Sequence, residues 1–200
     1  MRKKSHISLA RYLVRNLDDG DLRKHKLSFY IGSILPDCKP SFLYKKHEIT
    51  GTFPQVKREI ERLSSDYQKK YKRQKSKYYR NLGQVTHYLA DYFTFPHNTT
   101  FDGNLKDHCL YERDMKRELR VRIHTEEAVQ IFERQQKKQN QIRTAAQLFD
   151  YIEEMHRTYL KRRENLADDC RWIMEMCSWA LIGLVNIISG YENTATAVVI

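Results

Sequence analysis

Proline and glycine are both scarce in this chain of 200 residues, which contains four prolines and seven glycines. Three of the four prolines lie before position 60, so most of the chain is free of helix breakers. This shortage disfavours a β-sandwich, whose many turns need both residue types, and favours long uninterrupted helices. We therefore expect an all-α, single-domain multi-helix bundle, in which residues 126–200 complete the bundle begun by residues 1–125.

Cysteine is rare, and long apolar runs are missing. The four cysteines show no CxxC spacing, and Cys170 and Cys177 lie two turns apart on one expected helix, too far for a disulfide. Reduced thiols are typical of the cytosol. The most apolar stretch, residues 179–189, is too short to span a bilayer and contains Asn186. Since the basic N-terminus lacks the apolar segment of a signal peptide, we expect a cytoplasmic protein without a transmembrane segment.

Acidic residues are outnumbered, with 25 Asp and Glu against 36 Lys and Arg, which gives a net charge of +11. This charge favours anionic partners: phosphate esters, nucleic acid, or peripheral contact with an anionic membrane surface. Much of the excess lies in one run: Lys69, Lys70, Lys72, Arg73, Lys75, Lys77 and Arg80. The run has two interpretations, a solvated helix face or loop, or a phosphate-facing patch aided by the interleaved Tyr71, Tyr78 and Tyr79.

Apolar spacing predicts several helices. The first covers residues 6–17 with Ser5 as its N-cap, and the second covers residues 27–35 and ends at Pro36. An irregular loop over residues 38–53 carries His47, and Thr52 with Pro54 marks the next helix start.

Further helices are expected in the rest of the chain. One covers residues 76–95, and another begins after the capping residues 102–104. A polar link at residues 135–141 precedes a helix capped by Thr144, and the last helix covers residues 165–190.

Histidine and carboxylate pairs at helical spacing concentrate between His87 and Glu112. His87 precedes Asp91 by four residues, His108 precedes Glu112 by four, and no other histidine has an acidic residue at this spacing. Residues four apart lie on one helix face, so each pair directs an imidazole and a carboxylate to one point. His97 lies in the expected loop between the two helices. Imidazole nitrogens and carboxylate oxygens are zinc ligands, so this stretch predicts a metal site.

Three residues outside this stretch are further candidate ligands: His6, Asp37 and His47. Taken singly, each has an ordinary explanation, since His6 lies near a helix start, Asp37 follows a helix end and His47 lies in a loop. The remaining histidines lack acidic companions, and we interpret them as surface or hydrogen-bonded side chains: His25, His124 and His156.

The spacings His87-x3-Asp91-x5-His97 and His108-x3-Glu112 together resemble the central motif of the zinc-dependent phospholipase C family. This resemblance implies an all-helical fold, related to zinc-dependent single-strand nucleases, with a polynuclear zinc site in a cleft.

The outlying candidates resemble the family's remaining ligands. His6 lies on an apolar first helix, Asp37 follows the segment Ile-Leu-Pro, and His47 falls where the next histidine ligand is expected. The resemblance covers residues 5–115, which places the catalytic region within residues 1–125.

The resemblance also implies a division of the ligands between metals. One zinc ion would be held by Asp37, His47, His87 and Asp91, and a second by His97, His108 and Glu112.

Asp91 would bridge towards a third zinc ion that also needs His6. Secreted members of the family complete this third site with the amine and carbonyl of an N-terminal tryptophan. Here Met1 precedes His6 by five residues. The third site therefore uses the Met1 amine, binds weakly or stays empty.

The implied function is that of a zinc-dependent phosphodiester hydrolase, in which a metal-bridged hydroxide attacks the phosphorus of a phospholipid or similar phosphodiester. Asp37 would orient or deprotonate the attacking water. One alternative is a nuclease or nucleotide phosphoesterase using the same zinc cluster, which the charge of +11 suits. Another is a non-catalytic, metal-stabilised helical binding protein, disfavoured because a structural zinc site needs only four ligands.

Overall fold

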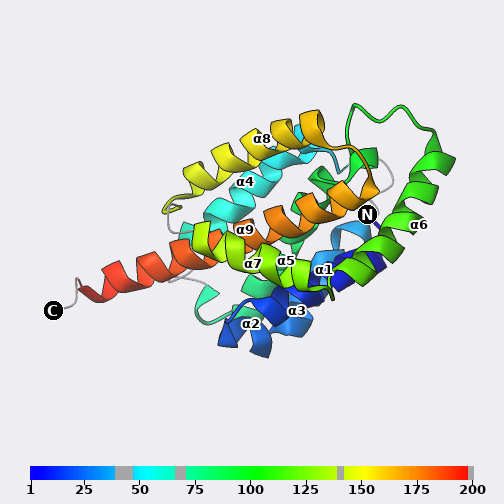
Figure 1. Ribbon diagram of the computed structural model, residues 1–200. Coiled ribbons are helices and arrows are strands. Elements are labelled where there is room, and N and C mark those ends of the chain that lie inside the picture. The colour runs from blue at the N-terminus through cyan, green and yellow to red at the C-terminus, as the bar shows by residue number, and fades with distance from the viewer. Residues whose placement is uncertain (39–46, 66–70, 139–141, 198–200) are drawn as a thin grey trace.

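The computed structural model describes residues 1–38, 47–65, 71–138 and 142–197, with side chains placed as far as residue 187. Within these ranges the chain forms nine α-helices and no strand, which confirms the predicted all-α fold. Figure 1 shows the other helices arranged around α9 (Leu166–Ala197), which runs through the middle of the molecule. This last helix extends past the predicted end at residue 190.

The first half of the chain contributes five helices: α1 (Lys3–Asn16), α2 (Gly20–Lys24), α3 (Lys26–Ile34), α4 (Ile49–Ser65) and α5 (Lys75–Tyr92). α5 is the most deeply enclosed of them, because every residue from Val85 to Tyr92 is buried. A helix enclosed on all sides is normally apolar throughout. The buried part of α5 nevertheless carries His87 and Asp91, so these two side chains need partners inside the molecule.

α3 and α5 approach each other at backbone distance, and two glycines permit it. A Cβ atom on Gly32 would lie 1.9 Å from the carbonyl oxygen of Arg80, and one on Gly83 would lie 2.3 Å from that of Phe29. Gly32 and Gly83 therefore make this close helix packing possible. The contact places the C-terminal end of α3, and Asp37 beyond it, next to His87.

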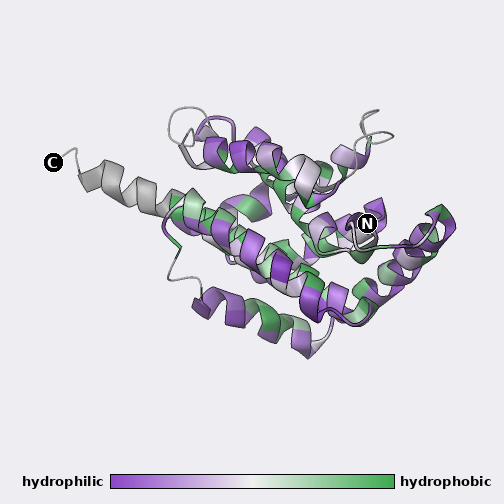
Figure 2. Ribbon diagram, turned by 90° about the horizontal axis from the view of Figure 1, so that it is seen from above, coloured by the Kyte–Doolittle hydropathy of each residue, from purple (hydrophilic) through white to green (hydrophobic). Residues whose placement is uncertain are grey.

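The remaining elements are the 3-10 helices η1 (Pro36–Cys38) and η4 (Phe95–His97), and the helices α6 (Leu105–Arg122), α7 (Glu126–Lys138) and α8 (Ala145–Arg162). Figure 2 shows hydrophilic and hydrophobic bands alternating along them, as expected for helices with one buried face. Asn104 caps α6 and Thr144 caps α8, each in a capping box, which confirms both predicted helix starts. α7 covers the first four residues of the predicted polar link, whose last three lie outside the described residues.

The predicted start of α1 is wrong. The helix begins at Lys3 with Arg2 as its N-cap, and Ser5 is a buried residue inside it. The reason is that Met1 is itself buried, so the chain enters the bundle before Ser5 and the helix starts earlier.

The predicted start of α4 is also wrong, since the helix begins at Ile49 and contains Pro54. Thr52 is buried rather than capping, because its hydroxyl donates to the carbonyl of Glu48 (2.8 Å) and contacts the Tyr92 hydroxyl (2.9 Å). Residues 49–53 therefore belong to the helix and not to the predicted loop, of which residues 39–46 lie outside the described part of the chain.

The tyrosines of the basic run do not take part in a phosphate-facing patch as expected. Tyr71, Tyr78 and Tyr79 are all buried, with edge-to-face contacts between Tyr71 and Tyr78 and between Tyr78 and Tyr79. Tyrosines in the core cannot stack on a bound base. Lys75 forms an ion pair with Asp21, and Lys69 and Lys70 lie outside the described residues.

Side chains from both halves of the chain join one hydrophobic core, which includes Leu13, Phe93, Ile131 and Trp179. A hydrogen bond from the buried Tyr12 hydroxyl to the Ala128 carbonyl (2.8 Å) joins α1 to α7. A membrane-crossing helix would need a longer apolar stretch than any helix offers in the described part of the chain. None of the four cysteines forms a disulfide.

Candidate metal centre

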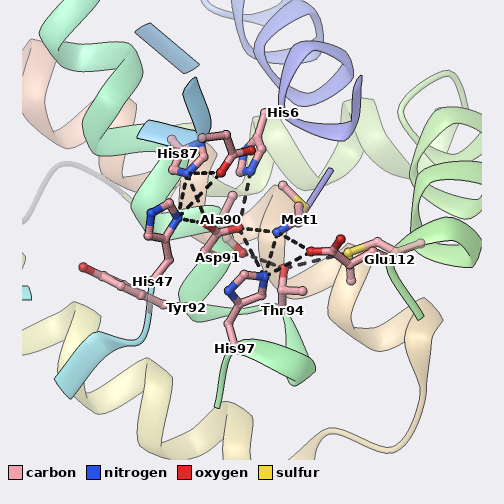
Figure 3. Close-up of polar contacts among 12 residues, drawn as sticks. Met1, His6, His47, His87, Ala90, Asp91, Tyr92, Thr94, His97 and Glu112 are labelled. Atoms are coloured by element: carbon pink, nitrogen blue, oxygen red, sulfur yellow. Dashed lines mark hydrogen bonds and ion pairs between the residues drawn. The ribbon is translucent and has the colours of Figure 1, made fainter. Parts of the chain in front are cut away.

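The last two turns of α5 place His87 and Asp91 on one buried face. Nδ1 of His87 donates to the backbone carbonyl of Ser33 at the end of α3 (2.9 Å), because a carbonyl only accepts. Nε2 of His87 therefore carries the free lone pair and faces Asp91 Oδ2 at 3.2 Å. Figure 3 shows the imidazoles of His6, His47, His87 and His97 gathered around Asp91.

The first cluster consists of Asp37, His47, His87 and Asp91, all buried. His47 Nδ1 lies 2.9 Å from Asp91 Oδ2, 3.1 Å from His87 Nε2 and 3.8 Å from Asp37 Oδ1. Nε2 of His87 lies 3.5 Å from Asp37 Oδ1. α5 supplies two of these residues, η1 supplies Asp37, and His47 precedes α4.

The second cluster consists of His97, His108 and Glu112, which are less buried. Oε1 of Glu112 lies 3.3 Å from Nε2 of His97 and 3.2 Å from Nε2 of His108. His108 and Glu112 on α6 thus lie next to His97 of η4, as expected for two helices joined by a loop that carries His97.

The amino group of Met1 lies between the two clusters. It donates to Oδ1 of Asp91 (2.6 Å) and to Nε2 of His97 (2.8 Å), and lies 3.2 Å from Oε1 of Glu112. His6 stacks on His87 with ring centroids 3.9 Å apart, and its Nε2 lies 3.3 Å from Asp91 Oδ1. Asp91 therefore faces the first cluster through Oδ2 and the Met1 and His6 nitrogens through Oδ1.

Burial and mutual charge set the protonation of these groups. Burial opposes ionisation of Asp91, but the Met1 ammonium and the nearby histidines outweigh it and hold the pKa of Asp91 well below its ordinary value. Burial, followed by repulsion from His87, lowers the pKa of His6 to about 3. Burial and the Met1 ammonium also lower the pKa of His97. At neutral pH Asp91 is therefore ionised, and His6 and His97 are neutral, which are the forms that bind metals.

Comparison with protein families gives one finding for this chain. The family model described as zinc-dependent phospholipase C matches residues 5–166, more than half of the sequence. The chain belongs to the zinc-dependent phospholipase C family. Neither the curated proteins nor the solved structures yield a match. The family match extends beyond residues 5–115, the range over which the resemblance was expected, and it includes α7 and α8.

The residues of the centre fit zinc. A tetrahedron with zinc–ligand distances of about 2.0–2.1 Å has edges of about 3.3 Å, and the distances in the first cluster, 2.9 to 3.8 Å, bracket this value. His6 supplies a second observation, because its buried Nε2 forms no hydrogen bond with the described residues. A buried nitrogen left in this state is costly unless another group, such as a metal ion, takes its lone pair.

The two clusters border an open cleft of about 440 Å³. Met1, Asp37 and Glu112 line it on the metal-centre side, and Arg2, Lys3, Lys4 and Lys116 are the other lining residues. Three aromatic residues next to the His87/Asp91 pair belong to the core, since Tyr88, Tyr92 and Phe93 are buried. Phe101 lies beside His108 with ring centroids 6.2 Å apart.

Two residues that support the second cluster were not predicted from the sequence. The Asn98 amide donates to the carbonyls of Tyr92 (3.2 Å) and Thr94 (3.0 Å), and its oxygen accepts from His156 Nε2 (2.8 Å). His156 on α8 thereby holds the turn that follows His97. Its burial with a hydrogen-bond partner agrees with the interpretation of this histidine as a satisfied side chain.

Asp169 on α9 is the second of these residues. Its carboxylate accepts from the backbone N–H of Phe95 (3.0 Å), from the Tyr111 hydroxyl and from Nε of Arg163 (3.0 Å). Phe95 begins η4, which carries His97, and Tyr111 directly precedes Glu112. This buried network ties both backbone segments of the second cluster to α9. The only signal in the sequence was an acidic residue on a helix expected to be buried.

Proposed function

We propose that this protein is a zinc-dependent phosphodiester hydrolase of the phospholipase C type. The observation that carries the proposal is that two ligand clusters lie beside one open cleft, and that the Met1 amine contacts Asp91 of the first cluster and His97 of the second. A purely structural zinc site is closed by four protein ligands, whereas hydrolytic metal sites keep positions open to water and substrate.

The ligands divide by cluster. Asp37, His47, His87 and Asp91 would hold one zinc ion, and His97, His108 and Glu112 would hold another. The Met1 amine and His6, which both lie near Oδ1 of Asp91, would hold a third ion, so the proposal adopts the first of the three options for that site. Zinc bound here supplies a Lewis acid that lowers the pKa of water and stabilises charge on phosphoryl oxygens.

Asp37 is the residue proposed to take the proton of the attacking water. It lines the cleft, and burial raises its pKa despite the attraction of His87. A carboxylate with a raised pKa holds a transferred proton better than an ordinary surface aspartate. Arg2 and Lys116 at the same cleft would bind the phosphate oxygens and keep the phosphorus near Asp37.

Phospholipid is the substrate class that family membership favours, and a nucleic acid strand is the second candidate, favoured by cations that continue beyond the cleft. Hydrolysis of phosphatidylcholine and of single-stranded DNA by the zinc-loaded protein distinguishes them. Inactivity on both, and on soluble phosphodiesters, would indicate the non-catalytic binding protein instead.

Replacement of the shared ligand tests the proposal directly. Asp91→Asn keeps the side-chain shape but removes the charge that faces both groups of nitrogens. We expect the zinc content to fall and hydrolysis of a soluble phosphodiester to drop by more than the ~10–100-fold that loss of an outer-shell partner costs. The control is Asp114→Asn, a solvent-accessible carboxylate on α6 that pairs with Arg113. Full zinc content and activity in Asp91→Asn would refute the shared-ligand role.

A further inference from the structure

A second hollow of about 410 Å³ lies between α1 and α6. It is lined by five cationic residues, one apolar residue and one serine, with no acidic residue among them: Lys3, Lys4, Arg11, Lys116, Arg120, Ile7 and Ser8. We call this hollow the α1–α6 groove. It brings together residues far apart in sequence, because α1 and α6 pack side by side (Figure 1).

The cations of this groove lack acidic partners. None of the five forms an ion pair within the described part of the chain, whereas other cations of α6 do so. Arg113 and Arg117 contact Asp114, and Arg122 contacts Glu118. Unpaired like charges in one hollow repel each other, and the potential they create concentrates anions there.

The groove continues into the cleft of the metal centre. Lys3, Lys4 and Lys116 line both spaces, so an anion in the groove is adjacent to one in the cleft. A substrate with one phosphate needs only the cleft. The groove therefore suits a substrate that carries further phosphates on one side of the scissile bond.

The dimensions of the groove favour a strand. Lys4 and Arg11 are seven residues apart on α1, a rise of about 10 Å. A nucleic acid strand carries one charge per ~3.4 Å of axis, so about three phosphates match this length. A bilayer surface is flat and meets protruding side chains rather than a hollow between two helices. Acyl chains would also find only Ile7 as apolar lining.

We propose that the α1–α6 groove binds the phosphate backbone of a single-stranded nucleic acid whose scissile phosphodiester lies at the metal centre. The inference rests on the proposed phosphodiester hydrolysis and names its substrate class. No aromatic residue lines the groove, so bases have no stacking platform there. Binding is accordingly independent of sequence and depends strongly on salt.

The test measures binding apart from hydrolysis. Zinc-loaded protein is titrated with a hydrolysis-resistant phosphorothioate oligothymidylate between about 50 and 200 mM salt. The double variant Arg11→Gln/Arg120→Gln removes two groove charges. We expect the slope of log K against log salt to become shallower by ~1.4, since each phosphate contact on a single strand contributes ~0.7. A matching circular dichroism spectrum and thermal midpoint show that the variant is folded.

The matched control is Arg113→Gln/Arg117→Gln, which removes the same charge from α6 outside the groove and keeps the wild-type slope. An uncharged methylphosphonate strand of equal length is expected not to bind. Equal slopes in both double variants would overturn the inference. Groove-dependent binding of phosphatidylserine vesicles without binding of the oligonucleotide would overturn it too and would indicate a membrane surface. Failure of hydrolysis alone, with slope changes as expected, would refute the proposed function and leave the groove as a strand-binding site.

Discussion

At the scale of single residues, Asp91 organises the centre. Its two oxygens face different partners: Oδ2 faces His47 and His87, and Oδ1 faces Met1 and His6. One carboxylate can serve several metals only if it is ionised and held rigidly. Full burial in α5 provides the rigidity, and the surrounding nitrogens provide the charge that keeps its pKa low.

Asp37 is expected to contribute to rate rather than only to metal binding. Asp37→Asn retains an oxygen at the cleft but cannot accept a proton. We expect kcat on a soluble phosphodiester to fall by about 10²–10⁴, the usual contribution of a general base. Zinc bound by the second cluster should remain, and metal analysis checks this. The control is Asp102→Asn, which changes an exposed carboxylate in the segment before α6. An unchanged kcat in Asp37→Asn would remove Asp37 from the chemistry.

Titration of the buried His156 is expected to make the free energy of unfolding depend on pH. Burial lowers its pKa to about 4, and the charged residues that line the adjoining pocket are Lys57, Glu153 and Arg157. The unfolded chain protonates this histidine below pH ~6.5, whereas the folded protein does so only below about 4. The folded state therefore loses up to about 1.4 kcal/mol per pH unit as the pH falls between these values.

Urea unfolding across this pH range checks the prediction. His156→Gln keeps a donor for Asn98 but does not titrate, so its stability should fall less steeply with decreasing pH than that of the wild type. Parallel curves for the two proteins would contradict the assignment.

At the scale of elements, the contact between α3 and α5 positions the first cluster. Gly83 faces the backbone of α3, where a Cβ atom would lie 2.3 Å from the Phe29 oxygen and 2.9 Å from the Ser33 nitrogen. The Ser33 carbonyl also orients His87. Any separation of the two helices would therefore disturb a proposed ligand.

Gly83→Ala is expected to destabilise the fold by about 1–3 kcal/mol or more, because overpacking against backbone cannot be relieved by a rotamer change. The control is Gly20→Ala, where a Cβ atom meets nothing within 4 Å and the change should be neutral or stabilising by up to about 1 kcal/mol. Urea unfolding with and without zinc measures both effects. Equal stabilities for the two variants would show that the helices can separate freely.

At the scale of the whole molecule, the metal centre joins segments that are distant in sequence. Its residues come from α1, η1, the segment just before α4, α5, η4 and α6, and α8 and α9 support it through His156 and Asp169. Ions bound at such a centre hold these segments together, so binding should stabilise the entire fold.

Zinc is therefore expected to raise the thermal midpoint. A site saturated at 100 times its dissociation constant adds about 2.7 kcal/mol to the free energy of unfolding. The comparison is between protein dialysed against a chelator and the same protein with zinc restored. Magnesium, which prefers all-oxygen sites, should have little effect. Equal midpoints with and without zinc would argue against a metal that binds the folded state.

The sequence by itself determined the local features. Scarce proline and glycine indicated an all-helical protein, and the capping residues Asn104 and Thr144 marked two helix starts. The four-residue spacings of His87/Asp91 and His108/Glu112 predicted shared faces because the α-helix repeats every 3.6 residues. These features depend on hydrogen bonds within a turn or two of backbone, so nearby residues suffice to predict them.

Only the tertiary structure decided what lies beyond one helix. It moved the start of α1 ahead of Ser5, placed the Met1 amine between the clusters, buried the tyrosines of the basic run and brought Asp169 to the second cluster. It also aligned the cations of α1 and α6 along one groove. Contacts between distant segments depend on how all the apolar faces are buried together, and no short stretch of sequence contains that information.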